Sequence, residues 1–113
     1  MCHLFVSQDP ATYAAETRSV RLHGHATSIR LEAAFWSILE EIAAREATPL
    51  TRFVAVLHDE ILARQGEVSN FASFLRVTCL HWMANQELHR RQAAERRAAR
   101  PRPAMLENAA AVA

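Results

Sequence analysis

Residues 17–32 read Thr-Arg-Ser-Val-Arg-Leu-His-Gly-His-Ala-Thr-Ser-Ile-Arg-Leu-Glu, and this stretch decides the fold. Polar and apolar side chains alternate along it, most clearly from Ser28 to Leu31, and this period of two is typical of a β-strand with one buried face. We therefore predict a strand over residues 26–31. Gly24 lies in the middle of the longer extended stretch, where it marks a bulge, a kink or a turn between two short strands.

The apolar period becomes helical after this strand. Residues 32–46 carry an apolar stripe at helical spacing and are expected to form a first helix. Thr48, which a proline follows, is the expected N-cap of a second helix that Gly66 ends. Ser69 or Asn70 is expected to cap a third helix with an equally regular stripe. The predicted fold class is therefore mostly α with one short β-strand.

A single strand cannot satisfy its own backbone hydrogen bonds, so the sequence favours a homodimer. Two copies of residues 26–31 would pair as an antiparallel ribbon, with Ser28 and Arg30 facing outward. Such a ribbon fits the major groove of DNA, where arginine can bind guanine O6 and N7 and serine can contact several bases. The expected dimer core comprises Ile29, Leu31, Phe35, Trp36, Leu39 and Leu57.

These residues resemble the ribbon-helix-helix superfamily, and one bacterial subgroup of it in particular. The resemblance spans about residues 17–83 and implies an intertwined homodimer that binds double-stranded DNA sequence-specifically, usually to repress transcription. Its motifs are Arg18-Ser19-Val20-Arg21-Leu22-His23-Gly24-His25, Thr27-Ser28-Ile29-Arg30-Leu31-Glu32, Phe35-Trp36, Glu41-Ile42-Ala43 and Ser73-Phe74-Leu75-Arg76.

The resemblance implies base contacts at three outward positions of the strand, and we expect two arginines to add phosphate contacts. The base-contacting positions are Ala26, Ser28 and Arg30, and the phosphate-contacting arginines are Arg18 and Arg21.

The superfamily also binds a DNA phosphate through backbone amides at a helix N-terminus, where the helix dipole favours an anion. This role corresponds to Thr48 and Leu50 here. Pro49, between them, has no N–H to donate and departs from the pattern. The third helix, which opens at Ser69, fits the same role, so the sequence leaves open which helix N-terminus binds the phosphate.

The charge of the chain is unevenly distributed. All 13 basic residues are arginine. Residues 1–86 hold seven arginines and nine acidic residues, whereas residues 87–102 hold six arginines and two glutamates. An acidic domain with a basic tail leaves a second hypothesis open, in which the chain is a dimeric protein-interaction module. A variant of it is an antitoxin-like protein whose tail folds on a protein partner.

The expected organisation has three parts. Residues 1–16 form an N-terminal accessory segment with a short helix that Asp9 caps. Residues 17–86 form the ribbon-helix-helix-like domain with an extra helix. Residues 87–113 form an arginine-rich, partly disordered tail, because a polar helix without an apolar face is marginal unless it docks.

The sequence gives no support to an enzyme. It has no Gly-rich phosphate loop, no GxSxG and no HExxH motif, so we expect no catalytic residue and no cofactor. His23 and His25 lie two apart, on one face of an extended strand, and no CxxC motif accompanies them, so we expect no metal site. Cys79 falls on an apolar helix face and is expected to be a buried, reduced thiol.

We also expect a cytoplasmic protein that does not enter a membrane. The chain has no run of roughly 20 apolar residues, and its N-terminus lacks the pattern of a secretory signal.

Overall fold

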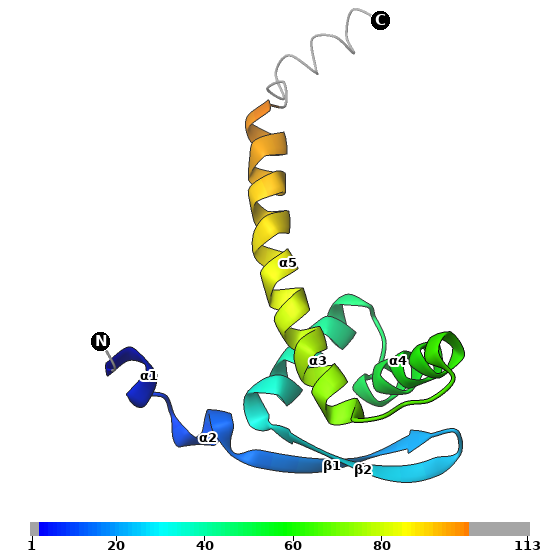
Figure 1. The fold of residues 1–113 in the computed structure, drawn as a ribbon. Coiled ribbons are helices and arrows are strands. Elements are labelled where there is room, and N and C mark those ends of the chain that lie inside the picture. Colours follow the sequence, from blue (N-terminus) through cyan, green and yellow to red (C-terminus); the bar gives the residue numbers. More distant parts are fainter. Residues whose placement is uncertain (1–2, 100–113) are drawn as a thin grey trace, which may run out of the picture. The chain divides into compact units, whose positions relative to one another are not determined.

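The computed structural model describes residues 3–99 of the 113-residue chain. The mostly helical fold with a two-stranded antiparallel ribbon is confirmed (Figure 1). The described residues divide into two compact units between Trp82 and Met83. The elements are α1 (His3–Val6), α2 (Pro10–Tyr13), β1 (Ala15–Leu22), β2 (His25–Glu32), α3 (Ala33–Arg45), α4 (Leu50–Gln65) and α5 (Phe71–Ala99).

Both strands of the ribbon come from one chain, which differs from the expected single strand that pairs with a second copy. β1 and β2 are antiparallel, and Leu22 pairs with His25 at the tip. Between them, His23 and Gly24 have positive φ angles of 53° and 78°. Left-handed backbone at both central residues is typical of a type I′ turn, whose twist matches that of the two strands. Of the three alternatives at Gly24, the turn is therefore the one adopted.

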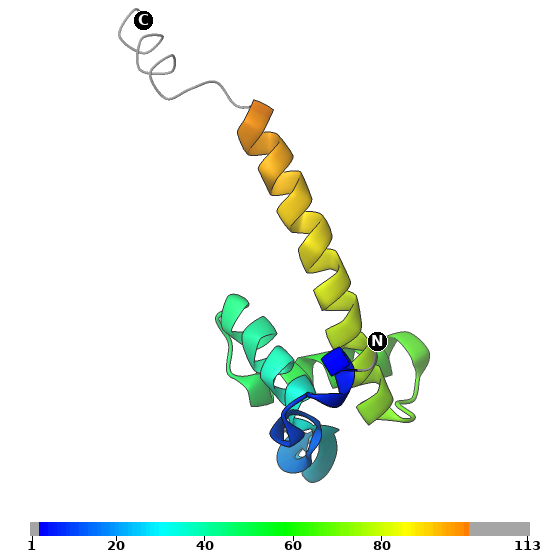
Figure 2. The ribbon, with the colours of Figure 1, turned by 90° about the vertical axis from the view of Figure 1, so that its left-hand side faces the viewer.

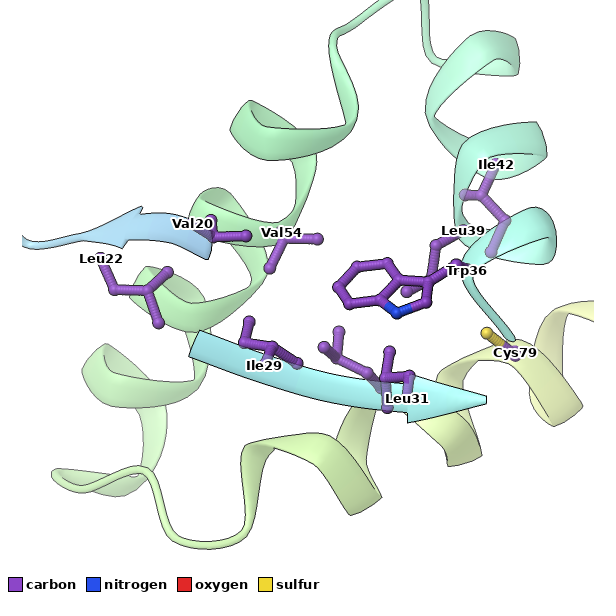
Figure 3. Packing of buried hydrophobic residues seen from close by; sticks show 10 residues of the cluster. Val20, Leu22, Ile29, Leu31, Trp36, Leu39, Ile42, Val54 and Cys79 are labelled. Carbon is purple, nitrogen blue, oxygen red and sulfur yellow. The ribbon is translucent and has the colours of Figure 1, made fainter. Parts of the chain in front are cut away.

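The hydrophobic core lies between the ribbon and the helices, and the side chains from both strands point into it (Figure 3). Trp36 occupies its centre and is only 1% exposed. Its indole Nε1 donates a hydrogen bond to the backbone oxygen of Glu16 at 2.9 Å, which joins α3 to β1. The other buried residues are Val20, Leu22, Ile29, Leu31, Leu39, Ile42, Ala43, Val54, Leu75 and Cys79.

The link between α3 and α4 differs from the expected N-cap at Thr48. The backbone N–H of Thr48 donates to the carbonyl oxygen of Ala43 at 3.0 Å, and the N–H of Ala47 donates to the carbonyl oxygen of Ala44 at 3.1 Å. Ala47 has a positive φ of 52°. These features make a Schellman motif that closes α3, so Thr48 belongs to the end of one helix and not to the start of the next. Pro49 is the N-cap of α4, without a side-chain hydrogen bond.

The other predicted helix ends agree with the structure. Asp9 caps α2 and accepts a hydrogen bond from the Ala11 N–H at 3.0 Å. Gly66 ends α4 with a left-handed φ of 80°. Asn70 precedes α5, and its Oδ1 accepts from the Ser73 N–H at 3.4 Å.

α5 continues into the arginine-rich segment, and the described part remains helical to Ala99. The first turns pack on the core, so the later residues extend an existing helix and bear no nucleation cost. Glu87 also lies 3.8 Å from Arg90 and 3.7 Å from Arg91, at favourable helical spacing. The rest of the expected tail, residues 100–113, lies outside the described residues.

None of the helices within residues 3–99 is long and apolar enough to cross a membrane.

Candidate nucleic-acid interface

The side of the ribbon away from the helices is an exposed polar surface. In both views α3 and α4 lie on one side of the hairpin (Figures 1 and 2). Residues paired across an antiparallel ladder point to the same side. The register therefore defines one surface, here called the ribbon face, from three exposed pairs, Thr17 with Arg30, Ser19 with Ser28, and Arg21 with Ala26.

The ribbon face brings together all three expected base-contacting positions, which are Ala26, Ser28 and Arg30. Two further hydroxyl side chains, from Thr17 and Ser19, were not expected there. The sequence did contain a sign of them, since polar and apolar residues alternate on both sides of Gly24. A turn at that glycine places β1 beside β2 and brings Thr17 and Ser19 to the same face.

The charge of the ribbon face differs from that of its domain. Its two charged side chains are both arginines, although residues 1–86 hold more acids than arginines. Arg21 Nη1 donates to the turn carbonyl of Gly24 at 3.0 Å. No ion pair or side-chain hydrogen bond within residues 3–99 engages Arg30, so its forked donors remain available.

Arg18 lies on the opposite side of β1 and does not join the ribbon face. Its guanidinium forms ion pairs with Glu40 at 2.6 Å and with Glu16 at 2.8 Å. It also lies 4.8 Å from the centre of the Trp36 ring, in a cation–π contact. The hydrogen bond to Glu40 is the main reason that its pKa is raised. Arg18 is thus engaged by contacts within the chain, and its phosphate contact stays a prediction.

Glu32 follows the outward register of Arg30, but an arginine from α5 neutralises it. Arg76 donates from Nε to Glu32 Oε1 at 2.8 Å and from Nη2 to Oε2 at 3.4 Å. This paired hydrogen bond lowers the pKa of the Glu32 carboxyl below its usual value. An anion approaching Arg30 therefore meets a carboxylate that already has a cationic partner.

The two candidate helix N-termini lie in different surroundings. At the start of α4, the Thr48 amide is already bound to Ala43 and Pro49 has no amide hydrogen, which leaves Leu50. The start of α5 instead borders β2, in a pocket of about 610 Å³. Its lining includes Ser28 and Arg30 from the ribbon face and Asn70, Phe71 and Ala72 from the start of α5.

The six residues expected in a dimer core all contribute to the core of one chain. Ile29, Leu31, Trp36 and Leu39 are buried, and Phe35 and Leu57 are partly buried against them. The hairpin and the helices therefore bury four of these side chains, and partly bury the other two, without a second copy. The unpaired strand that favoured a dimer is also absent from the described ribbon, because β1 pairs with β2.

The two histidines of the ribbon do not lie side by side on an extended strand, because His23 lies in the turn. Its Nε2 lies 3.0 Å from Asp59 Oδ1 on α4. The imidazole of His58, also on α4, lies beside it, with ring centres 5.5 Å apart. No sequence spacing had linked these three residues.

Cys79 is a buried free thiol, as expected. Burial raises its pKa to about 11, so the thiol is protonated at neutral pH. Its Sγ lies 3.6 Å from the Phe35 carbonyl oxygen, to which it donates. Packing accounts for this cysteine, and its environment is unsuited to a nucleophile.

The chain is similar to known proteins in sequence and in structure. The sequence model described as a ribbon-helix-helix domain matches residues 15–83. The chain is also similar to a solved structure, an uncharacterized protein from Bordetella pertussis Tohama I, with 47% sequence identity and a TM-score of 0.76. That match covers 80% of this chain and 72% of the other. A search of curated proteins gives no match.

Proposed function

Since the chain belongs to the ribbon-helix-helix domain family, we propose that it is a regulator that binds double-stranded DNA through its ribbon face. Members of this family are typically DNA-binding regulators or antitoxins, and their domains are generally not enzymatic. The observation that carries the proposal is the ribbon face itself. It is exposed and polar, and the charged side chains of its three pairs are the guanidinium groups of Arg21 and Arg30. The next outward residue of β2, Glu32, is paired with Arg76.

Base recognition falls to three positions of β2. In the major groove, Arg30 would donate two hydrogen bonds to O6 and N7 of a guanine, and Ser28 would donate to or accept from several bases. Ala26 has only a methyl group, which can contact the methyl group of a thymine. Ser19 lies opposite Ser28 in the register and would reach the same part of the groove.

Phosphate binding falls to Arg21 and to a helix N-terminus. Arg21 lies at the turn end of the ribbon face, and one of its nitrogens is held by Gly24. Of the two helix starts, that of α5 fits this role better than Leu50 and Thr48, because it lines the same pocket as Ser28 and Arg30. The free amides of a first helical turn favour an anion there.

A homodimer is part of the proposal. Ribbon-helix-helix proteins usually dimerise. The described sheet has two strands, so each strand keeps one edge without a strand partner within residues 3–99. Val77 and Leu80 on α5 are each 60% exposed, which is unusual for large apolar side chains of one helix. A second copy that covers these features would present two ribbon faces to DNA.

The test selects binding sites from a random DNA library with the full chain and measures affinity by fluorescence anisotropy. Arg30→Ala should lose about 1–3 kcal/mol of discrimination at one guanine and keep its fold, because this outward side chain is exposed. Arg64→Ala is the matched control, an exposed arginine on α4 away from the ribbon face. Equal discrimination by Arg30→Ala and the unaltered chain would contradict base reading by the ribbon.

A second candidate is a protein-binding role for the second unit. Met83 and Leu88 are 50% and 49% exposed on an arginine-rich helix. An apolar contact flanked by guanidinium groups suits an acidic protein partner. A stoichiometric protein that copurifies with the full chain and is lost on deletion of residues 87–113 would favour this role.

A further inference from the structure

Three potential metal ligands converge where the tip of the ribbon meets α4. His23 comes from the turn between β1 and β2, and His58 and Asp59 are neighbours on α4. One ligand atom from each residue lies within 4.8 Å of the other two. The closest pair, His23 Nε2 and Asp59 Oδ1, is 3.0 Å apart.

His58, one of these three residues, also has a polar atom without a partner. Its Nδ1 is buried and has no hydrogen-bond partner among the described residues. Packing fixes the ring, which contacts Phe71 edge-on at 5.1 Å and His23 at 5.5 Å between ring centres. A buried polar atom that no protein group satisfies is rare in folded proteins and calls for an explanation.

We propose that His23, His58 and Asp59 bind a divalent transition-metal ion, and that zinc is the ion that fits best. Two imidazoles and one carboxylate are a common zinc ligand set, and three protein ligands leave the fourth position to water. Calcium and magnesium prefer oxygen ligands throughout, and copper(I) prefers sulfur, so this donor set disfavours all three.

The geometry requires only a small adjustment. Ligand atoms about 2.0–2.2 Å from a tetrahedral zinc ion lie roughly 3.3 Å from one another. The His23 and Asp59 atoms are already near this separation, and both must move toward the His58 atom, whose ring is held by packing. The side chains of His23 and Asp59 are 50% and 58% exposed, so they can move and an ion can enter. The bound ion would join the turn to α4.

His23 and His58 line the same pocket as Ser28, Arg30 and the start of α5, so the proposed zinc site borders the proposed DNA contacts. Its three ligands do not belong to the ribbon face, and zinc binding can be measured without DNA. The competing explanation is a plain hydrogen bond between His23 and Asp59, for which His58 would be irrelevant. Variants of His58 and of Asp59 therefore distinguish the two.

The experiment titrates zinc into the full chain, after treatment with a chelator, by calorimetry. We expect one ion per chain at this site and a loss of affinity of at least about 10-fold in both His58→Gln and Asp59→Asn, since even indirect support of a metal ligand is worth that much. His25→Gln is the matched control, because His25 lines the same pocket but lies outside the cluster. Its affinity should equal that of the unaltered chain.

Two further readouts keep the test decisive. The melting temperature should rise with zinc in the unaltered chain and in His25→Gln, but not in Asp59→Asn, whose exposed side chain can change without loss of the fold. Cobalt absorption in the visible range should disappear in the same variants. Absence of zinc binding, or binding that His58→Gln and Asp59→Asn both leave unchanged, would overturn the proposal.

Discussion

Replacement of Trp36 tests the packing between the ribbon and α3. The indole is 1% exposed, donates to Glu16 and lies beneath the Arg18 guanidinium. Trp36→Ala should lower the free energy of unfolding by about 3–5 kcal/mol, the range for truncation of a large buried aromatic. Domains of this size are stable by about 5–15 kcal/mol, so this variant should be close to unfolding.

Trp36→Phe separates the contribution of the indole hydrogen bond from that of the buried aromatic ring. It keeps an aromatic ring under Arg18 but removes the Nε1 donor and leaves the Glu16 carbonyl oxygen without its partner. The lost hydrogen bond should account for about 1–2 kcal/mol, so the loss should fall clearly below that of Trp36→Ala.

Urea unfolding at several protein concentrations gives these values and also reports a dimer, whose midpoint rises with concentration. Val56→Ala, at an exposed position of α4, is the control and should change the free energy of unfolding little. A loss below about 1 kcal/mol in Trp36→Ala would refute the assignment of Trp36 to the centre of the core.

Three further predictions concern other parts of the chain. Ala47→Gly should raise the free energy of unfolding by about 0.5–1 kcal/mol in urea titrations, because Ala47 has a left-handed φ that glycine adopts without strain; destabilisation would contradict the Schellman motif. The unaltered chain should be more stable than Glu32→Gln at neutral pH, and this difference should decline on acidification, because the lowered pKa of Glu32 favours the folded state only while the carboxyl is ionised. Unfolding curves from about pH 7 to pH 3 measure the difference. A difference that grows on acidification would contradict the ion pair with Arg76. Deletion of residues 87–113 should weaken binding to all DNA sequences alike and flatten its salt dependence, while an unchanged salt slope would assign this segment to another partner.

The alternation of residues 26–31 predicted β2 and its outward side chains correctly, but β1 was harder to predict. A strand pattern depends on apolar residues at every inward position, and β1 has Glu16 and Arg18 at two of them. Arg18 occupies its inward position because it covers Trp36 and pairs with Glu40. Contacts between distant residues of this kind leave no periodic signal in a sequence.

The helix ends show the same limit on a local scale. Thr48 before a proline is a common N-cap pattern, and Gly66 was correctly predicted to end α4. The motif that closes α3 instead depends on a left-handed residue, and Ala47 gives no sign of that conformation. The cluster of His23, His58 and Asp59 could not be predicted from neighbouring residues either, because it requires the hairpin turn to contact the middle of α4.

The most direct test of the central claim maps bound DNA onto the chain. Backbone amide signals of the isotopically labelled full chain are assigned and followed by nuclear magnetic resonance while a selected DNA duplex is added. We predict that the largest shifts fall on the ribbon face, at Ser19, Ala26, Ser28 and Arg30, with further shifts at the start of α5. Shifts confined to residues 87–99, with the ribbon face unchanged, would contradict it.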